Sequence, residues 1–395
     1  MKDTHERKRL GDVAAINAGN SAPQDDKLFE GGTHPFFRTS DVGRIRVGDI
    51  SVSADHLNER GIAKLRRFPV GTILMPKSGA STFLNHRVMM VVPGYVSSHL
   101  ATITANEVDV HPRFLLHFLS TIRAQDLIQD SEYPSLNLGD IERVEVPVPP
   151  LYEQRRILTI LDEAFEGIAT AKANAEKNLQ NARAVFDSKL YSLLGKAGAT
   201  WPQKTLREVS IDFGRGKSKH RPRNDPKLYG GPYPFIQTGD VRNADHLITE
   251  YTQTYSDAGL AQSKLWPKGT LCITIAANIA ETGVLDFDAC FPDSVIGVVV
   301  DERQTSSKYL EYMLHTAKAS LKAKGKGSAQ DNINLATFEN ERFPFPDLPT
   351  QAGIVGLLDE LSAEVQRLED VCGMKLAALD ELKKSLLHRA FSGAL

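Results

Sequence analysis

The chain has 395 residues, of which 41% are hydrophobic and 24% are charged, and its net charge at pH 7 is −2. This length is too great for one ordinary core and suits two domains of roughly 150 to 200 residues each. The composition also argues against several classes: the apolar runs 88–92 and 295–300 are far shorter than the roughly 20 residues of a membrane span, the charged residues 1–9 lead into no apolar signal segment, and the charge balance shows no general basic surplus for nucleic acid.

Residues 1–150 are expected to form a first globular domain of mixed β-strands and helix. Short runs of β-branched and aromatic residues between turn-forming residues are typical of strands. The strand candidates are Phe36–Thr39, Ile73–Met75, Val88–Val92, Leu100–Thr104 and Val144–Val148. A helix is expected around residues 113–128, so this domain is predicted to contain both β-strands and an α-helix.

A polar loop lies between two of these strand candidates. It carries Lys77, Ser78, Asn85, His86 and Arg87 around a glycine-containing turn. Arginine or lysine pairs with guanine and asparagine with adenine in the major groove, so these donors suit contacts with DNA bases. An ordinary polar hairpin turn explains the same residues equally well. The matching loop of the second half, residues 276–282, has no basic residue.

Residues 151–195 show the pattern of a long coiled-coil helix. Apolar or small residues recur with gaps that alternate mostly between four and three. They are Ile157, Leu161, Ala164, Ile168, Ala171, Ala175, Leu179, Ala182 and Phe186. Prolines between positions 147 and 150 prevent an earlier helical start. At about 1.5 Å per residue the helix would be roughly 60 Å long, which suits a spacer.

Residues 196–203 are expected to be a linker, and residues 204–349 a second globular domain with two basic clusters. Its strand candidates are Phe235–Thr238, Leu271–Ile275 and Val295–Val300, and a helix is expected around Lys308–Lys322. The candidate DNA contacts in the two clusters are Arg215, Lys217, Lys219, His220, Arg221, Arg223, Lys322, Lys324 and Lys326. A single basic cluster is usually a solvated face, but two in one half of the chain favour contacts with DNA phosphates.

Residues 350–395 repeat the helical pattern. The seam positions of this second helix are Ile354, Leu358, Leu361, Val365, Leu368, Cys372, Leu376, Leu379 and Lys383. We predict that the two helices pair through Ile157, Leu161, Ile168, Leu179, Ile354, Leu358, Val365 and Leu376.

The chain is therefore an internal repeat. Marker residues such as Asn137, Gln154 and Leu161 recur 197 positions later, with no insertion or deletion between them. Because the seams of the two helices share one period, a chain truncated near Leu194 is expected to pair with a second copy of itself.

No catalytic or metal-binding motif is found in the sequence. Gly216-Lys217-Ser218 looks like the end of a P-loop, but Ile211 stands where that pattern requires glycine. There is no Asn-Pro-Pro-Tyr or Asp-Pro-Pro-Tyr segment to hold a flipped base, and the histidines lack metal-ligand spacing. The three cysteines have no CxxC spacing, so free thiols in a reducing cytoplasm are expected. We therefore expect a non-catalytic chain.

Four short motifs stand in a fixed order along the chain. They are Phe-Ile-Gln-Thr-Gly-Asp-Val at 235–241, Phe-Pro-Asp-Ser-Val at 291–295, a Pro-x-Pro-x-x-x-Gln entry to each long helix, and the ending from Lys384 to Gly393. Together they resemble the specificity subunit of type I restriction-modification enzymes. The resemblance covers the whole chain in the family's order, which is target recognition domain, helix, target recognition domain, helix. The first copy departs from the family pattern at residues 37–42.

The resemblance implies an α+β fold in which two mixed α/β target recognition domains are joined by two long helices that form an antiparallel coiled coil with pseudo-twofold symmetry. It implies a DNA-binding subunit of a phage-defence system, with each domain recognising one half of an asymmetric bipartite site. The implied partners are double-stranded DNA, two methyltransferase subunits and restriction subunits in the cytoplasm. These partners, and not this chain, would bind S-adenosylmethionine, ATP and Mg²⁺. The residues by themselves leave open a cytosolic coiled-coil scaffold with two protein- or glycan-binding modules.

Overall fold

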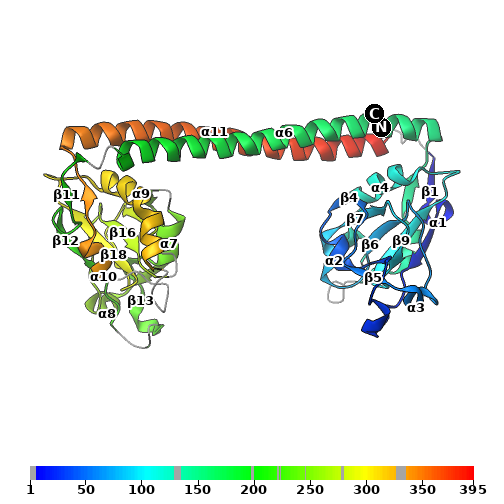
Figure 1. Cartoon of the computed structure of the whole chain (residues 1–395), viewed down its shortest axis with the longest axis horizontal. Helices are drawn as coiled ribbons and strands as arrows, with labels where there is room; N and C mark the ends of the chain where they lie inside the picture. The colour runs from blue at the N-terminus through cyan, green and yellow to red at the C-terminus, as the bar shows by residue number, and fades with distance from the viewer. Residues whose placement is uncertain are drawn as a thin grey trace. The chain divides into compact units, whose positions relative to one another are not determined.

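The computed structural model describes residues 6–128, 135–196, 200–219, 222, 224–244, 246–276, 280–325 and 335–395. The chain divides into two compact units (Figure 1). The first unit comprises Met1–Ala175 and Gly373–Leu395, and the second comprises Glu176–Cys372. Each unit therefore contains one globular segment and portions of both long helices. Within the described ranges, no helix is long and apolar enough to cross a membrane.

The first unit is built around a five-stranded sheet with strand order β2-β9-β6-β7-β4. Its strands are β2 (Ala14–Ala18), β9 (Leu100–Ala105), β6 (Ile73–Pro76), β7 (Arg87–Met90) and β4 (Val47–Ile50). A second sheet contains β5 (Asp55–Leu57), β3 (His34–Phe37) and β8 (Tyr95–Val96), and β1 (Arg7–Arg9) pairs with β10 (Glu145–Pro147). The helices and 3-10 turns are α1 (Leu10–Val13), η1 (Asp26–Leu28), α2 (Thr39–Val42), α3 (Glu59–Ile62), η2 (Ala80–Leu84), α4 (Pro112–Thr121), η3 (Ala124–Asp126) and α5 (Leu138–Glu142).

The second unit repeats this arrangement with a sheet of order β12-β18-β16-β17-β14. Its strands are β12 (Ser210–Arg215), β18 (Val295–Val300), β16 (Leu271–Thr274), β17 (Thr282–Leu285) and β14 (Leu247–Ile248). Two further pairs are β13 (Tyr229–Phe235) with β15 (Gln253–Tyr255), and β11 (Gln203–Lys204) with β19 (Phe343–Pro344). The helices and short turns are η4 (Ser192–Lys196), η6 (Pro226–Leu228), α7 (Thr238–Asn243), α8 (Asp257–Ala261), α9 (Ser307–Gly325) and α10 (Leu335–Asn340).

Two predicted strands end earlier than expected, and for the same reason. The candidates 36–39 and 235–238 stop at Phe37 and Phe235, because α2 and α7 begin two or three residues later. In α2 the Oδ2 atom of Asp41 accepts the backbone N–H of Arg38 at 2.8 Å. In α7 the Oδ2 atom of Asp240 accepts the backbone N–H of Gln237 at 2.7 Å. A carboxylate at the third helical position satisfies a donor that precedes the helix, which favours the helical start. The helix expected at 113–128 is also shorter, since α4 ends at Thr121.

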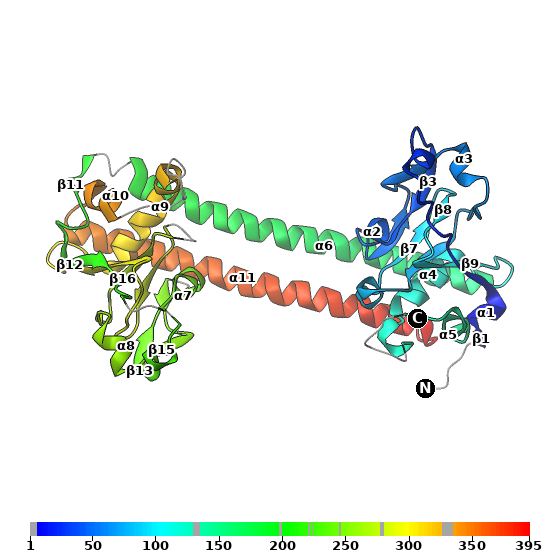
Figure 2. The same cartoon turned by 90° about the horizontal axis from the view of Figure 1, so that it is seen from below.

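α6 (Leu151–Tyr191) and α11 (Leu348–Phe391) are each one unbroken helix (Figure 2). The first-unit core contains Ile157 and Leu161 from the start of α6 together with Leu387 and Phe391 from the end of α11. The ring of Phe391 lies edge-on to Phe114, with ring centroids 5.2 Å apart.

The core of the second unit uses the opposite ends of the same two helices. It contains Leu190 from the end of α6 and Ile354 and Leu358 from the start of α11. Leu194, in the turn that follows α6, completes this group. Because the start of one helix meets the end of the other in each unit, the two helices are antiparallel, as predicted.

Candidate DNA interface

The polar loop after β6 contains two predicted DNA contacts that remain accessible. Lys77 is partly buried, and its backbone N–H donates to the carbonyl of His99 at 3.0 Å. The hydroxyl of Ser78 lies 2.9 Å from Nδ1 of His99. Backbone and hydroxyl contacts hold this part of the loop, and the side-chain amine of Lys77 forms no hydrogen bond or ion pair with any residue that the structure describes.

The other predicted residues of this loop bond inward. Arg87 is fully buried, and its Nη1 and Nη2 atoms donate to the carbonyls of His86 at 2.8 Å and Ile122 at 3.2 Å. Burial lowers the pKa of Arg87 to about 10. A guanidinium committed to two internal carbonyls cannot also reach a base edge, so the prediction for Arg87 is corrected.

Asn85 has an internal role as well. It adopts a left-handed backbone conformation with φ of 56°, which asparagine tolerates better than most residues. Its Oδ1 accepts the backbone N–H of Ala124 at 2.7 Å, and its Nδ2 donates to Gln125 Oε1 at 2.9 Å. His86 Nδ1 lies 2.7 Å from the carbonyl of Ile45. Asn85 and His86 therefore hold the loop to its neighbours, and the predicted base contact of Asn85 is corrected.

The basic cluster after β12 is anchored at both ends. Gly216 donates its N–H to the carbonyl of Val295 at 2.9 Å, and a Cβ at this glycine would lie 2.1 Å from the carbonyl oxygen of Phe291. Only glycine allows two backbones to approach this closely. At the other end, Asp225 Oδ1 accepts the N–H of Lys227 at 3.2 Å. We call residues 216–225 the second anchored segment.

Basic side chains project from this segment and from the strand before it. Arg215, Lys217 and Lys219 are exposed. The Nε atom of Arg215 donates to the carbonyl of Asp293 at 2.7 Å, which orients its guanidinium. The predicted residues His220, Arg221, Arg223 and Lys326 lie outside the described residues, as do the side chains of Lys322 and Lys324. Lys318, beside that second cluster, pairs with Glu281 at 2.5 Å.

The first unit has an anchored segment of the same construction, formed by residues 19–25. A Cβ at Gly19 would lie 2.2 Å from the carbonyl oxygen of Ser97. Asp25 Oδ1 accepts the N–H of Lys27 at 3.0 Å, as Asp225 does in the second unit. This first anchored segment contains no basic residue.

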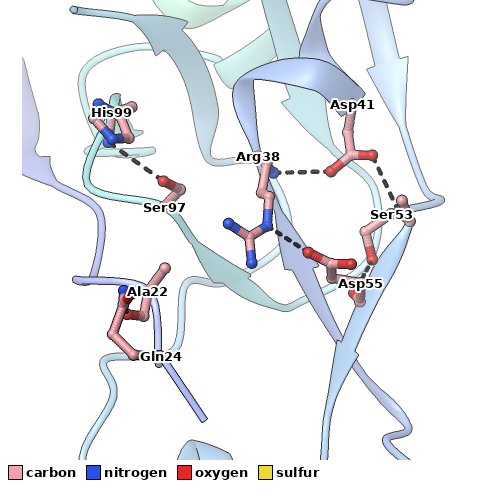
Figure 3. Close-up of polar contacts among 9 residues, drawn as sticks. Ala22, Gln24, Arg38, Asp41, Ser53, Asp55, Ser97 and His99 are labelled. Atoms are coloured by element: carbon pink, nitrogen blue, oxygen red, sulfur yellow. Dashed lines mark hydrogen bonds and ion pairs between the residues drawn. The ribbon is translucent and has the colours of Figure 1, made fainter. Parts of the chain in front are cut away.

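A positive charge lies close to the first anchored segment on a neighbouring element. Arg38 precedes α2, and its Nε donates to Asp55 Oδ2 (Figure 3). Its guanidinium carbon lies 5.2 Å from the ring centre of Phe36. Phe36 forms a small apolar cluster with Leu57 and Tyr95, and Ala22 of the anchored segment packs against this cluster. The Nη1 and Nη2 atoms of Arg38 make no hydrogen bond with any residue that the structure describes, and the side chain is 38% exposed.

Gln237 occupies the position of Arg38 in the second unit. The φ and ψ angles are −112° and 169° at Arg38 and −106° and 170° at Gln237. Gln237 Nε2 donates to Gln253 Oε1 at 2.8 Å, and Gln253 stands opposite Phe235 as Asp55 stands opposite Phe36. Sequence reasoning missed both residues. The sequence does contain a signal for both positions: each is followed three residues later by an aspartate, which marks the start of a helix after a short apolar strand.

The predicted helix-pairing residues lie on the inner faces of α6 and α11. Ile157, Leu161, Ile168, Ile354 and Leu358 are buried. Leu179, Val365 and Leu376 are partly buried. Lys383, which the pattern also placed in the seam, lies over the ring of Phe165 with its Nζ atom 4.7 Å from the ring centre. The charged end of a lysine at a partly buried seam position is thus placed over an aromatic face.

The first unit also contains a buried histidine beside α6. His117 of α4 is 8% exposed, and its Nε2 lies 3.9 Å from Asp162 Oδ1. Desolvation lowers the pKa of His117 to about 4, and the charge of Asp162 only partly opposes this effect. No group of histidine, cysteine or carboxylate side chains in the described part of the chain could hold a metal ion. The cysteines Cys272, Cys290 and Cys372 are free and buried.

These features define a two-copy protein with an equivalent polar surface in each unit and paired helices. A model of the family described as the type I restriction modification DNA specificity domain matches residues 2–180 and 199–371. The chain belongs to this family and is a specificity subunit of a type I restriction-modification system. No observation on the described residues favours the alternative of a coiled-coil scaffold with two protein- or glycan-binding modules.

Relatives and solved structures agree with this assignment. The chain is 22% identical over 393 residues to the putative type I restriction enzyme specificity subunit S.HindORF215P of Haemophilus influenzae, covering 97% of this chain and 94% of the relative. It is 21% identical to the putative MjaX specificity subunit of Methanocaldococcus jannaschii, covering 89% and 79%.

Two solved structures share the fold over nearly the whole chain. A chain from a study of complex assembly and conformational transition of the type I R-M system superposes with a TM-score of 0.82 at 20% identity, covering 99% of this chain and 98% of that chain. The HsdS subunit of Thermoanaerobacter tengcongensis gives a TM-score of 0.63 at 20% identity, covering 100% and 98%. At these identities the likeness establishes the fold.

Proposed function

We propose that each unit recognises one half of an asymmetric bipartite DNA site. The observation that carries this proposal is the repetition of one backbone construction with different polar side chains. Arg38 and Gln237 occupy equivalent positions, and the first and second anchored segments have the same anchors but different charge. Arginine suits guanine and glutamine suits adenine, so equivalent surfaces with different donors are expected to recognise different sequences.

The second anchored segment contributes contacts with DNA phosphates. Arg215, Lys217 and Lys219 are exposed, and the backbone beneath them is held at Gly216. Cations on an anchored backbone follow a phosphate chain with little loss of conformational entropy on binding. In the first unit Lys77 and Ser78, which are partly exposed in the loop after β6, are proposed as contacts.

The chain directs chemistry that other subunits perform. We propose that two methyltransferase subunits bind S-adenosylmethionine and methylate adenine, and that restriction subunits use ATP and Mg²⁺. This chain supplies DNA recognition and no catalytic residue. The long helices act as spacers between the two recognition surfaces and as docking surfaces for the methyltransferase subunits. The assembly is proposed to act in the cytoplasm.

Selection of bound DNA from a random pool tests the proposal. The full-length chain is assembled with its methyltransferase partner, and the recovered sequences are aligned. The expected result is one site with two different specific halves and a gap of constant length. Recovery of no enriched sequence, or of a single uninterrupted site, would contradict the proposal.

A further inference from the structure

Two ion pairs join the long helices, one in each unit. In the first unit, Nζ of Lys172 on α6 lies 2.5 Å from Oδ1 of Asp380 on α11. In the second unit, Nε of Arg183 on α6 lies 2.6 Å from Oε1 of Glu369 on α11. In both pairs α6 supplies the cation and α11 the anion.

The internal repeat makes the two pairs equivalent. Lys172 and Glu369 occupy the same position of their helices, 197 residues apart, and so do Arg183 and Asp380. Both positions are basic in α6 and acidic in α11. The seam position between them does not differ in this way, because Leu179 of α6 corresponds to Leu376 of α11, whereas Phe186 further along the seam corresponds to Lys383. Charge at Lys172 and Arg183, opposite in sign to Glu369 and Asp380, therefore distinguishes the two helices.

We propose that these charges select the pairing of α6 with α11 and oppose the pairing of either helix with a second copy of itself. Two α6 helices in the same register would place Lys172 of each copy opposite Arg183 of the other. Two α11 helices would place Glu369 opposite Asp380. Like charges at contact positions of paired helices are destabilising, whereas unlike charges specify the partner. The surface formed by Lys172 and Arg183 thus fits an acidic helix, and its partner is the second helix of the same chain.

The apolar ends of the helices give no comparable discrimination. Leu190 and Leu194 correspond to Leu387 and Phe391, and all four side chains are buried in the cores of the units. Glu176 and Asp187 lie one helical turn beyond the two basic positions of α6, so they reduce the repulsion but do not occupy the positions of Glu369 and Asp380. The charge pattern therefore argues against the self-pairing expected for a chain truncated near Leu194.

Each ion pair is expected to contribute modestly to the pairing of the helices, and the contributions of the two pairs add. The side chains are 29% and 59% exposed in one pair and 62% and 24% exposed in the other, so water screens them partly. Partly exposed ion pairs contribute little individually. Replacing two attractive pairs by two repulsive ones is expected to change the pairing equilibrium on the order of tenfold.

A full-length variant can reproduce the charges of a self-pair within one chain. In E369K/D380R the second helix carries the basic residues of the first, so Lys172 and Arg183 face like charges. We expect a lower thermal and urea midpoint than in the unchanged chain. Raising the salt concentration from about 0.05 M to about 1 M should narrow the difference, because salt screens the repulsion in the variant and the attraction in the unchanged chain.

Two further variants make this result specific to pairing. K172E/R183D/E369K/D380R reverses every charge and should restore the midpoint of the unchanged chain. E360K/D370R makes the same change in net charge at exposed residues of α11 that form no ion pair with α6 within the described residues, and it should change the midpoint less. An E369K/D380R chain that melts like the unchanged chain at low salt would overturn the proposal. So would a fourfold variant that is no more stable than E369K/D380R, since the loss would then not come from the pairing of charges.

Discussion

The first and second anchored segments share their construction and differ in charge. Each follows the first strand of its main sheet, passes over another backbone at a glycine, and ends at an aspartate that accepts a backbone N–H two residues later. Residues 19–25 contain no basic residue, whereas residues 216–225 contain Lys217 and Lys219 among others. In the first unit the nearby positive charge is instead on Arg38, where the second unit has Gln237.

This difference shows which positions of the two anchored segments can differ in residue type. The anchors are backbone contacts, and a side chain at Gly19 or Gly216 would collide with a carbonyl. Ser21 and Gln24 of the first anchored segment and Lys217 and Lys219 of the second are exposed, so charge at these positions can change without a collision of this kind. If the two segments contact DNA as proposed, they would keep their geometry while the chemistry that they present to DNA differs.

The largest expected effect comes from breaking the two cores at equivalent positions. Leu161 and Leu358 are both fully buried, in the cores of the first and second units respectively. Replacing either by aspartate leaves an unpaired charge among apolar groups and should cost about 3 to 5 kcal/mol. Hydrogen exchange should show the loss in the first unit for Leu161→Asp and in the second for Leu358→Asp. Leu382→Asp, at a side chain that is 47% exposed, is the control. Equal loss in both units from either variant would show that the cores are not separate.

A pH titration separates the two units next. The pKa of buried His117 is lowered to about 4, so between pH 4 and about 6.5 the unfolded chain binds the proton more readily. Its contribution to stability is complete above about pH 6.5 and is lost as the pH falls toward 4, by at most about 3 kcal/mol. In the His117→Gln variant, the urea midpoint should change less with pH between pH 4.5 and 7 than it does in the unchanged chain. Desolvation also lowers the pKa of His315 in α9, but the surface of its side chain is more exposed than that of His117, so His315→Gln should change the pH dependence less. Identical profiles for the two variants would be the contrary result.

Arg87 provides a test of internal against external roles. Arg87→Leu leaves the carbonyls of His86 and Ile122 without their donors and should cost about 1 to 3 kcal/mol. The salt dependence of DNA binding by the folded protein should not change. Lys77→Ala should show the reverse, with little effect on stability and weaker DNA binding. If the Arg87→Leu variant binds DNA with a reduced salt dependence, Arg87 contacts DNA after all.

The smallest expected effect in free energy concerns the anchored segments themselves. Replacing Arg215, Lys217 and Lys219 by alanine should weaken DNA binding and flatten its salt dependence, because each lost phosphate contact removes roughly 0.9 from the slope of log K against log salt. Adding lysine at Ser21 and Gln24, both exposed in the first anchored segment, should steepen the slope. An unchanged slope in both variants would show that neither segment touches phosphates.

The long helices and most of the central strands were predictable because each leaves a pattern among neighbouring residues, and the repeat because the same residue types recur 197 positions later. The seam residues Leu161 and Leu358 are buried as predicted. The loop from Lys77 to Arg87 shows the opposite case. Its donors suit a DNA base and a backbone carbonyl equally well, so residue type could not indicate which of them bond inward.

The roles of Arg38 and Gln237 were missed for a related reason. Each lies in an apolar strand candidate, but the aspartate three residues later starts a helix instead. The N–H···carboxylate bonds of Asp41 and Asp240 then hold these residues beside the small sheet of β3 and β5 in the first unit and of β13 and β15 in the second. The helix-start signal was present in the sequence. The partners Asp55 and Gln253, on another strand, were not predictable from local spacing.

The sequence by itself determined the period of 197 residues, the two amphipathic helices and the glycine and proline positions at which each element ends. The helices and element ends depend on residues within a few positions of one another, and the period follows from comparing the two halves of the chain. Only the tertiary structure decided that Arg87 bonds to Ile122, that Lys172 meets Asp380, and that the end of α11 completes the first core. Such contacts join residues that are far apart in the chain, and burial or a specific partner is decided only when the chain has folded around them.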